Sequence, residues 1–225
     1  MIDMQAAGAA AHPWWQDWRG RAVAIVGGGP SAGTVDLTKL QGRMPVVVIN
    51  ESFRLCPWAD ILYSCDMEWW AMRMKDAKKF AGIKLGINDT DNPYKAPGIH
   101  KLTIKKHLNR WVREFLMETP GTIGSGGNSG FQMINLLAQF GADRIALIGF
   151  DMHTKGGTHW HGLHESPLRN PDQVRFSIWR ETMEAAVPQI AALGIDVVNC
   201  SMDSALTGFR TMPFDEMLEA WGSKP

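Results

Sequence analysis

Apolar runs rich in β-branched residues alternate along this chain with longer amphipathic stretches, and this alternation constrains the fold more than any other feature. The runs RAVAIVG (21–27) and MPVVVIN (44–50) have the length and composition of buried strands. Strands that alternate with helices pair in parallel, so we expect a Rossmann-like α/β three-layer sandwich with a mostly parallel sheet. Further strands are expected over 59–66, 82–88, 98–104, 143–151 and 195–201, and helices over 67–80, 106–118, 129–141 and 172–194, the last kinked at Pro188.

Length and charge indicate one globular domain that does not bind nucleic acids through its charge. The 225 residues are 45% apolar, and 23 Lys and Arg residues balance 23 Asp and Glu residues. A net charge of zero argues against non-specific binding to a nucleic-acid backbone. We expect a Trp-rich segment over 1–20 and a single nucleotide-binding domain over 21–225. Trp14, Trp15 and Trp18 would pack that segment onto the domain or, as the less favoured alternative, form an interface in a homo-oligomer.

Cysteine usage and hydropathy indicate a cytoplasmic protein without a membrane span. Cys56, Cys65 and Cys200 are odd in number, lie far apart and form no zinc-ribbon spacing, which is typical of a reducing compartment. The N-terminal segment lacks the basic and apolar regions of a signal peptide. No run of about eighteen apolar residues occurs, so we expect no membrane span.

A glycine-rich turn follows the first strand. Gly28, Gly29, Pro30 and Ser31 stand where a strand passes into a helix, and a helix beginning near Ser31 would direct free backbone N–H groups at an anion. We therefore predict that a phosphate approaches the backbone here. The stretch also fits G-x-G-x-x-A, with Glu51 about 20 residues on, where an acidic residue would bind a ribose. An NAD- or NADP-dependent oxidoreductase is therefore an alternative, against which Pro30 counts.

A second glycine-rich loop opens the predicted helix at 129–141. In GTIGSGGNSGFQM (121–133), Asn128 or Ser129 can cap the helix, and Gly130 follows. Two glycine-rich helix starts in one α/β domain predict two sites for anionic groups, such as the phosphates of one nucleotide. In a doubly wound sheet, ligands bind at the carboxyl ends of the strands. The other polar residues expected to converge there are Asn50, Glu51, Asp66 and Asp151.

Four of the seven histidines lie close together within GFDMHTKGGTHWHGLHESP (149–167), at positions 153, 159, 161 and 164. The favoured hypothesis is a catalytic and phosphate-binding loop, because histidine moves protons near neutral pH. A metal site is the close alternative, and a chance surface cluster is the least favoured one. The metal ligands would be His159, His161 and His164, with Asp151 or Asp66 as a fourth, although the spacing matches no strong zinc signature. An HxH pair on a strand would place both rings on one face.

The order of these motifs resembles that of the bacterial sialyltransferases of the Campylobacter type. The blocks that carry the resemblance are VAIVGGGPSAGTVDLTKL, VVVINESF, SGFQM and DRIALIGFDMHTKGGTHW. They also resemble the archaeal hydroxymethylpterin pyrophosphokinase-like group of Rossmann-type proteins and proteins of phages and prophages. The first resemblance implies glycosyl transfer from a nucleotide-sugar to an acceptor hydroxyl without a required metal. The second implies a metal-dependent pyrophosphokinase or phosphotransferase, and a non-catalytic nucleotide-binding module is a third alternative.

The sialyltransferase resemblance also implies roles for single residues. The family's donor-binding G-N-G-P-S loop is matched at 27–31, its asparagine after the second strand by Asn50, and its S-G pair by Ser129 and Gly130. Two family tyrosines that meet the donor phosphate fall at His153 and His159, which would therefore stabilise the leaving phosphate. His161 or His164 would take the proton of the acceptor hydroxyl.

Overall fold

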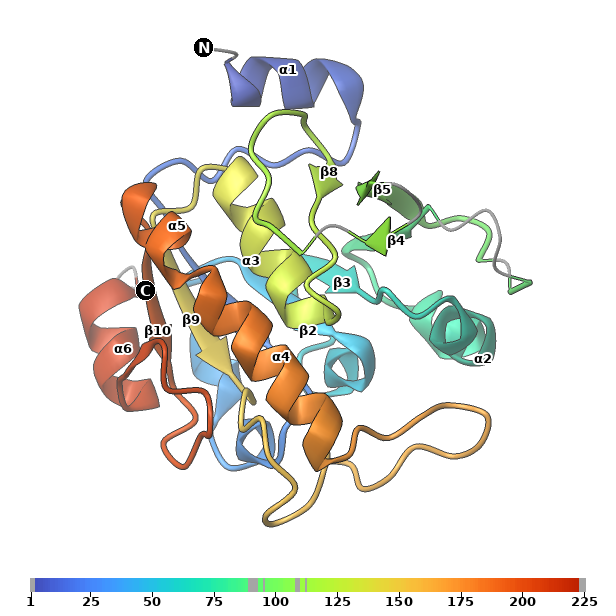
Figure 1. Ribbon diagram of the computed structural model, residues 1–225, viewed down its shortest axis with the longest axis vertical. Helices are drawn as coiled ribbons and strands as arrows, with labels where there is room; N and C mark the ends of the chain where they lie inside the picture. Colours follow the sequence, from blue (N-terminus) through green and yellow to red (C-terminus); the bar gives the residue numbers. More distant parts are fainter. Residues whose placement is uncertain (1–2, 89–92, 95, 108–109, 112, 223–225) are drawn as a thin grey trace.

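The computed structural model describes residues 3–88, 93–94, 96–107, 110–111 and 113–222 and contains a nine-stranded sheet. Its strands pair in parallel, in the order β11-β10-β9-β1-β2-β3-β4-β5-β8 (Figure 1). The expected Rossmann-like α/β fold is therefore confirmed. The strands are β1 Ala22–Val26, β2 Val46–Ile49, β3 Ile61–Tyr63, β4 Ile83–Ile87, β5 His100–Ile104, β8 Thr122–Ile123, β9 Arg144–Ile148, β10 Asp196–Asn199 and β11 Arg210–Thr211.

Helices cover both faces of this sheet. On one face α3 (Ser129–Gln139) contacts β1, β2 and β8, and Trp179 of α4 (Gln173–Ala185) lies near Gly127, two residues before α3. Because crossovers between parallel strands are right-handed, α2 and the 3-10 turns between β1, β2 and β3 belong to the opposite face. The remaining elements are α1 Met4–Ala11, η1 Pro30–Gly33, η2 Leu37–Leu40, η3 Asn50–Arg54, α2 Met67–Ala77, α5 Val187–Ala192 and α6 Phe214–Trp221.

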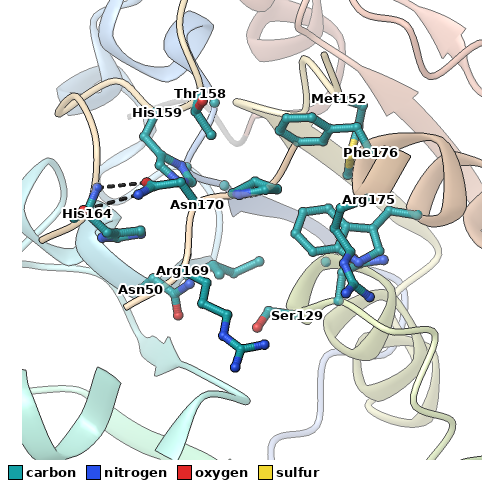
Figure 2. A pocket seen from close by; sticks show the side chains of 18 of the residues that line it. Asn50, Ser129, Met152, Thr158, His159, His164, Arg169, Asn170, Arg175 and Phe176 are labelled. Carbon is teal, nitrogen blue, oxygen red and sulfur yellow. Dashed lines mark hydrogen bonds between the residues drawn. The ribbon is translucent and has the colours of Figure 1, made fainter. Parts of the chain in front are cut away.

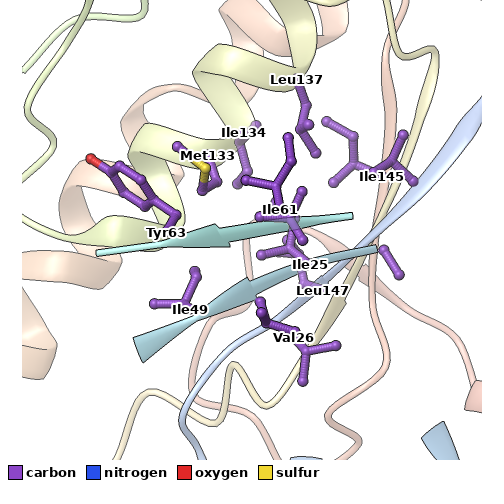
Figure 3. Packing of buried hydrophobic residues seen from close by; sticks show 14 of the residues in the cluster. Ile25, Val26, Ile49, Ile61, Tyr63, Met133, Ile134, Leu137, Ile145 and Leu147 are labelled. Atoms are coloured by element: carbon purple, nitrogen blue, oxygen red, sulfur yellow. The ribbon is translucent and has the colours of Figure 1, made fainter. Parts of the chain in front are cut away.

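The centre of the sheet and the helix above it form a continuous core. Ile25 of β1 pairs with Val47 of β2 on one side and with Leu147 of β9 on the other, and all three are fully buried. Every residue of α3 is buried, and Figure 3 shows Ile134 and Leu137 of this helix directed toward the strands. Close packing across these elements fixes the carboxyl ends of β1, β2 and β9 relative to one another.

The path of the chain across the sheet reverses between β1 and β9. From β1 it proceeds through β2, β3, β4 and β5, whereas from β9 it proceeds to β10 and β11 on the other side. Loops that leave two neighbouring strands in opposite directions open a crevice at the carboxyl ends, where ligands of such sheets bind. The two segments that leave the sheet at this crevice are 27–31 and 149–153.

The N-terminal tryptophans pack onto the end of α3, as the favoured interpretation of the sequence expects. The rings of Trp15 and Trp18 meet Phe140 edge-on, with centroids 4.9 and 5.3 Å away. Gln5 bridges the two parts, since its Oε1 accepts from Trp15 Nε1 at 2.8 Å and its Nε2 donates to the carbonyl of Gln139 at 2.8 Å. The division of the chain into 1–20 and 21–225 stays a prediction.

The helix expected over 106–118 is wrong. Lys106–His107 (β6) pairs antiparallel with Arg110–Trp111 (β7), and residues 108, 109 and 112 lie outside the described residues. Farther on, the buried side chain of Asn135 accepts from the N–H of Leu116 at 3.0 Å and donates to its carbonyl at 2.7 Å. These contacts from α3 hold the segment in irregular backbone, so tertiary structure overrides its amphipathic pattern.

Pro188 divides the long helical region at 172–194 rather than only bending it. α4 ends at Ala185, and Pro188 lies in the first turn of α5, where its missing N–H has no cost. Among the helices formed by described residues, none combines the length and the apolar character needed to cross a membrane.

Candidate functional site

A cavity of about 570 Å³ opens at the crevice between β1 and β9. Asn50, Ser129 and Arg169 lie on one side of it in Figure 2, and Arg175 and Phe176 lie across from His159 and His164. The carboxyl ends of the strands thus converge on one space, as expected for a doubly wound sheet. The predicted site residues that line it are Gly28, Gly29, Asn50, Glu51, Asp66, Asn128, Ser129, Gly130, Asp151, His153, His159, His161 and His164. Pro30 and Ser31 are not among its lining residues.

The glycines after β1 accommodate the chain itself. A Cβ on Gly29 would lie 2.0 Å from Oδ2 of Asp151 and 2.7 Å from the carbonyl oxygen of Gly149. A Cβ on Gly28 would meet only the ring of His159, with Nδ1 at 3.2 Å. The close approach at Gly29 is therefore made by the segment after β9, which differs from the predicted phosphate. Both glycines line the cavity, and at Gly28 a side chain would meet only the ring of His159.

Ser31 and Asp151 join the two strand ends. The backbone N–H of Ser31 donates to Oδ1 of Asp151 at 3.2 Å, and its Oγ lies 2.8 Å from Oδ2 of Asp151 and 2.8 Å from Oγ of Ser201. Instead of the helix expected to begin near Ser31, the structure has only the short 3-10 turn η1. The N–H of Ser31 is bound to Asp151 and is not free to bind an anion. These contacts give Ser31 and Asp151 a structural role, and their contact with a nucleotide stays a prediction.

Asn50 combines an unusual backbone with an unpaired side chain. It follows β2 with a φ of 51°, in the left-handed region that few residues other than glycine adopt. Its Oδ1 is buried, and no described residue donates a hydrogen bond to it. Met152, which follows β9 and lines the same cavity, also has a positive φ, of 57°. Strained backbone and unpaired polar atoms concentrate at binding sites, so this edge of the cavity is a candidate site for a ligand.

Glu51 belongs to an ion-pair network of the protein. Its Oε2 accepts from Arg54 at 2.8 Å, and its Oε1 accepts from Arg73 at 2.5 Å and from the indole of Trp69 at 3.2 Å. Burial raises the pKa of Glu51, but the arginines and Trp69 outweigh it and the net effect is a lowered pKa. Glu51 is thus already engaged, which differs from the free ribose ligand of the dinucleotide hypothesis.

Asp66 and Asn128 cap the two helices that begin at the cavity. Oδ1 of Asp66 accepts from the N–H of Glu68 at 2.9 Å at the start of α2, and Oδ1 of Asn128 accepts from Phe131 at 2.9 Å at the start of α3. Gly130 lets α3 approach β9, because a Cβ there would lie 2.4 Å from the ring of Phe150. Of the two cap candidates at α3, Asn128 therefore fills the role, and the start of this helix lines the cavity.

His159, His161 and His164 form one cluster at the cavity wall. The rings of His159 and His161 are stacked at 5.1 Å with 4° between their planes, and the ring of His164 lies 4.5 and 4.8 Å from them. Burial lowers the pKa of all three, that of His159 to about 4, and their mutual repulsion lowers the pKa values of His159 and His161 further. The imidazoles are therefore neutral near pH 7. The segment is a turn rather than the strand expected for HxH, although the two rings do lie on the same side.

The loop that carries this cluster is anchored at two points. Trp160 donates its backbone N–H to the carbonyl of Gly28 at 3.0 Å and its indole N–H to Oγ of Ser52 at 3.2 Å. Asn170 accepts from the N–H of His164 at 2.8 Å and donates back to its carbonyl at 3.1 Å, as the dashed lines of Figure 2 show. The rings are thus held in place from both ends of the turn.

His153 stands apart from the other three histidines. Its Nε2 lies 2.6 Å from the carbonyl oxygen of Asp203, and because a carbonyl only accepts, Nε2 carries the proton. Its Nδ1 therefore has a free lone pair, and this atom is buried without a partner among the described residues.

Solved structures with a similar fold include those of a sialyltransferase. One is CstII from Campylobacter jejuni in complex with the substrate analogue cytidine-5'-monophosphate, which is 12% identical with a TM-score of 0.52 and covers 86% of this chain and 85% of that one. Another is the sialyltransferase CST-II in complex with a trisaccharide acceptor and CMP, which is 12% identical with a TM-score of 0.51 and covers 85% and 86%. At this identity the likeness is one of fold, and it confirms the sialyltransferase-like fold expected from the motifs. No protein-family model and no curated protein sequence matches the chain. The resemblances to pyrophosphokinase-like and phage proteins stay predictions.

Two arginines and two aromatic residues are among the lining residues that the sequence motifs do not single out. Arg169 and Arg175 line the cavity, and neither guanidinium forms an ion pair or hydrogen bond with any described residue. Phe176 and Trp179 of α4 add an aromatic wall, and the indole N–H of Trp179 is buried without a partner in the described chain. The only local signal was Asp172, whose side chain caps α4 and so starts the helix beside the cavity.

Proposed function

We propose that this cavity binds a nucleotide-sugar and that the protein transfers the sugar to an acceptor hydroxyl. The fold is that of a sialyltransferase, and the solved structures of that fold hold CMP and, in one case, an acceptor. A nucleotide-dependent transferase therefore agrees with the fold at a coarse level. The residues of this chain that support the finer proposal are Asn50, the two arginines and His153.

The observation that carries the proposal is the free amide oxygen of Asn50. A buried carbonyl oxygen without a donor costs about 1–3 kcal/mol, and a φ of 51° adds strain at the same residue. A ligand N–H or O–H that donates to Oδ1 would remove the unfavourable free energy of the unpaired oxygen. Nucleobase amino groups and ribose hydroxyls are donors of this kind.

The anionic part of the donor would lie between α3 and α4. The start of α3 directs its positive dipole at the cavity. Arg169 and Arg175 offer planar guanidinium groups that bind phosphate oxygens through paired hydrogen bonds. The four acidic residues at the cavity are already engaged, Asp66 and Asp172 as helix caps, Asp151 by Ser31 and Glu51 by arginines.

His153 is the residue that we assign as the general base. Its Nδ1 would take the proton of the acceptor hydroxyl while the oxygen forms a bond to the anomeric carbon of the sugar. The bond from that carbon to the phosphate oxygen breaks in the same step, and the nucleotide leaves with the electron pair. The carbonyl of Asp203, which fixes the tautomer, would also stabilise the imidazolium that forms.

The oxidoreductase alternative has less support from the structure. A dinucleotide-binding fold places the pyrophosphate at the N-terminus of a long helix that follows the first strand. Here β1 is followed by a four-residue 3-10 turn whose Ser31 N–H is bound to Asp151. The phosphotransferase and the binding module remain as rivals that a ligand screen separates.

The test uses Asn50→Gly, because glycine adopts a positive φ freely and the change removes only the amide. We expect CMP, UMP or another nucleotide to raise the melting temperature of the wild type. We expect Asn50→Gly to weaken the binding of that nucleotide about 10-fold or more, as the loss of one buried hydrogen bond predicts. The free protein should become more stable, because glycine removes both the unpaired oxygen and the strained backbone angle. The control is Arg21→Ala. Arg21 is exposed and lies just before β1, at the amino ends of the strands and away from the cavity.

Transfer itself is measured by mass spectrometry of acceptor oligosaccharides incubated with nucleotide-sugars. His153→Gln should lower turnover by about 100-fold or more and leave the affinity for the nucleotide nearly unchanged. Stabilisation by NAD alone, or turnover only with ATP and Mg²⁺, would contradict the proposal in favour of one of its rivals. Nucleotide binding without any turnover would support the non-catalytic module.

A further inference from the structure

We propose that His159, His161 and His164 form a zinc site that leaves one coordination position open toward the cavity. The proposal rests on these three residues and does not depend on the transferase activity. It goes beyond the general-base role expected for His161 and His164, because a nitrogen that binds a metal cannot also take a proton.

The three rings already have the arrangement of a ligand set. One nitrogen of each ring lies within 4.8 Å of the corresponding nitrogen of the other two. Zinc–nitrogen bonds of about 2.0–2.1 Å place the nitrogens of a tetrahedral site about 3.3 Å apart, so the nitrogens need to approach one another by at most about 1.5 Å. Rotation about the side-chain torsions of three residues in a turn is sufficient for such a movement.

Two ring nitrogens in the cluster are buried without a partner. They are Nε2 of His159 and Nδ1 of His164, and no described residue offers either a hydrogen bond. Buried imidazole nitrogens are normally hydrogen-bonded, so each unpaired one requires an explanation. A metal ion bound by these two atoms would satisfy both at once.

The surrounding chain pre-organises the cluster. Trp160, between the first two ligands, is fixed to Gly28 and Ser52, and Asn170 fixes the backbone of His164 by two hydrogen bonds. Such support lowers the entropy that is lost when the ligands are ordered around an ion.

The composition of the set indicates the metal and the type of site. Imidazole ligands suit zinc and neighbouring transition metals better than magnesium or calcium, which prefer oxygen. Structural zinc sites have four protein ligands, whereas three protein ligands leave a position for water or a substrate oxygen. Asp151, which the sequence suggested as the fourth ligand, is absent from the group that the described residues form. The open position would therefore face the space where we place the nucleotide.

The test is metal binding by the full chain in the absence of any nucleotide. Protein freed of metal by a chelator is titrated with Zn²⁺ by calorimetry, and Co²⁺ is added separately as a spectroscopic probe. We expect one Zn²⁺ per chain and the intense visible absorption of tetrahedral Co²⁺. His159→Ala, His161→Ala and His164→Ala should each lower the affinity for Zn²⁺ by more than about 100-fold. Such a loss exceeds the effect of changing residues that only hydrogen-bond to a metal ligand. His100→Ala, an exposed histidine of β5, is the control that should bind as the wild type does.

The zinc titration can support or overturn the proposed site. Binding below one equivalent in the wild type, or single variants that bind like His100→Ala, overturns the proposal. Melting of the metal-free variants shows which of them fold, and any one folded variant that loses Zn²⁺ while the wild type binds it supports the site. Because the titration contains no nucleotide, its result is independent of the outcome for the transferase.

Discussion

Gly28 and Gly29 are adjacent residues with ordinary backbone angles, yet their surroundings assign them different roles. A side chain on Gly29 would collide with Asp151 and with the backbone of Gly149, whereas one on Gly28 would reach only the ring of His159. Both glycines line the cavity, but only the second is needed for the contact between the ends of β1 and β9. From the sequence alone the two are indistinguishable.

We expect Gly29→Ala to destabilise the protein by about 2 kcal/mol or more, because Asp151 is held by Ser31 and cannot move away freely. Gly28→Ala should change the free energy of unfolding by less than about 1 kcal/mol. Urea denaturation of the two variants and the wild type measures both. Equal effects of the two substitutions would contradict the distinct structural role of Gly29.

At the scale of elements, the strands could be predicted because each is an apolar run that the sheet buries. β1, β2 and β9 and the fully buried α3 lie within the predicted ranges. The errors occur where a side chain from a distant element decides the backbone. Asn135 accepts the N–H of Leu116 and holds irregular backbone where a helix was predicted. Asp151 accepts the N–H of Ser31, which a helix beginning at Ser31 would have left free for an anion.

The same reason limits the prediction of the site. The convergence of loops follows from topology, so the histidines, Asn50 and the start of α3 could be expected at one edge. The unpaired state of Arg169 and Arg175 could not be predicted, because it depends on which acidic groups already form hydrogen bonds or ion pairs with other residues. Nor could the mutual contacts of His159, His161 and His164, which a turn and not a strand brings together.

Asn135→Ala tests the claim that α3 determines the irregular segment beside it. The change removes the acceptor of two buried N–H groups, those of Leu116 and Gly124, each bound at 3.0 Å. We expect a loss of about 3 kcal/mol in the free energy of unfolding, at about 1–3 kcal/mol for each unsatisfied group. Asn88→Ala, at an exposed residue after β4, should be nearly neutral. A small effect at Asn135, measured by the same denaturation, would show that water replaces the amide.

At the scale of the whole molecule, a net charge of zero coexists with a cavity whose free charges are positive. Arg169 and Arg175 have no partner among the described residues, whereas the acidic residues that line the cavity are bound within the protein. Attraction of an anionic ligand should therefore come from this local field and not from the molecule as a whole.

This arrangement predicts how salt affects the binding of a nucleotide. Exposed charges interact less as ionic strength rises, since the screening length falls from about 10 Å at 0.1 M to about 3 Å at 1 M salt. The dissociation constant of CMP, measured by calorimetry, should therefore increase several-fold over this range in the wild type. In Arg169→Ala/Arg175→Ala binding should be weaker and nearly independent of salt, whereas Arg21→Ala should keep the full dependence. If the double variant keeps the slope of the wild type, the phosphate does not lie between these arginines, and its site must be sought nearer the histidine cluster.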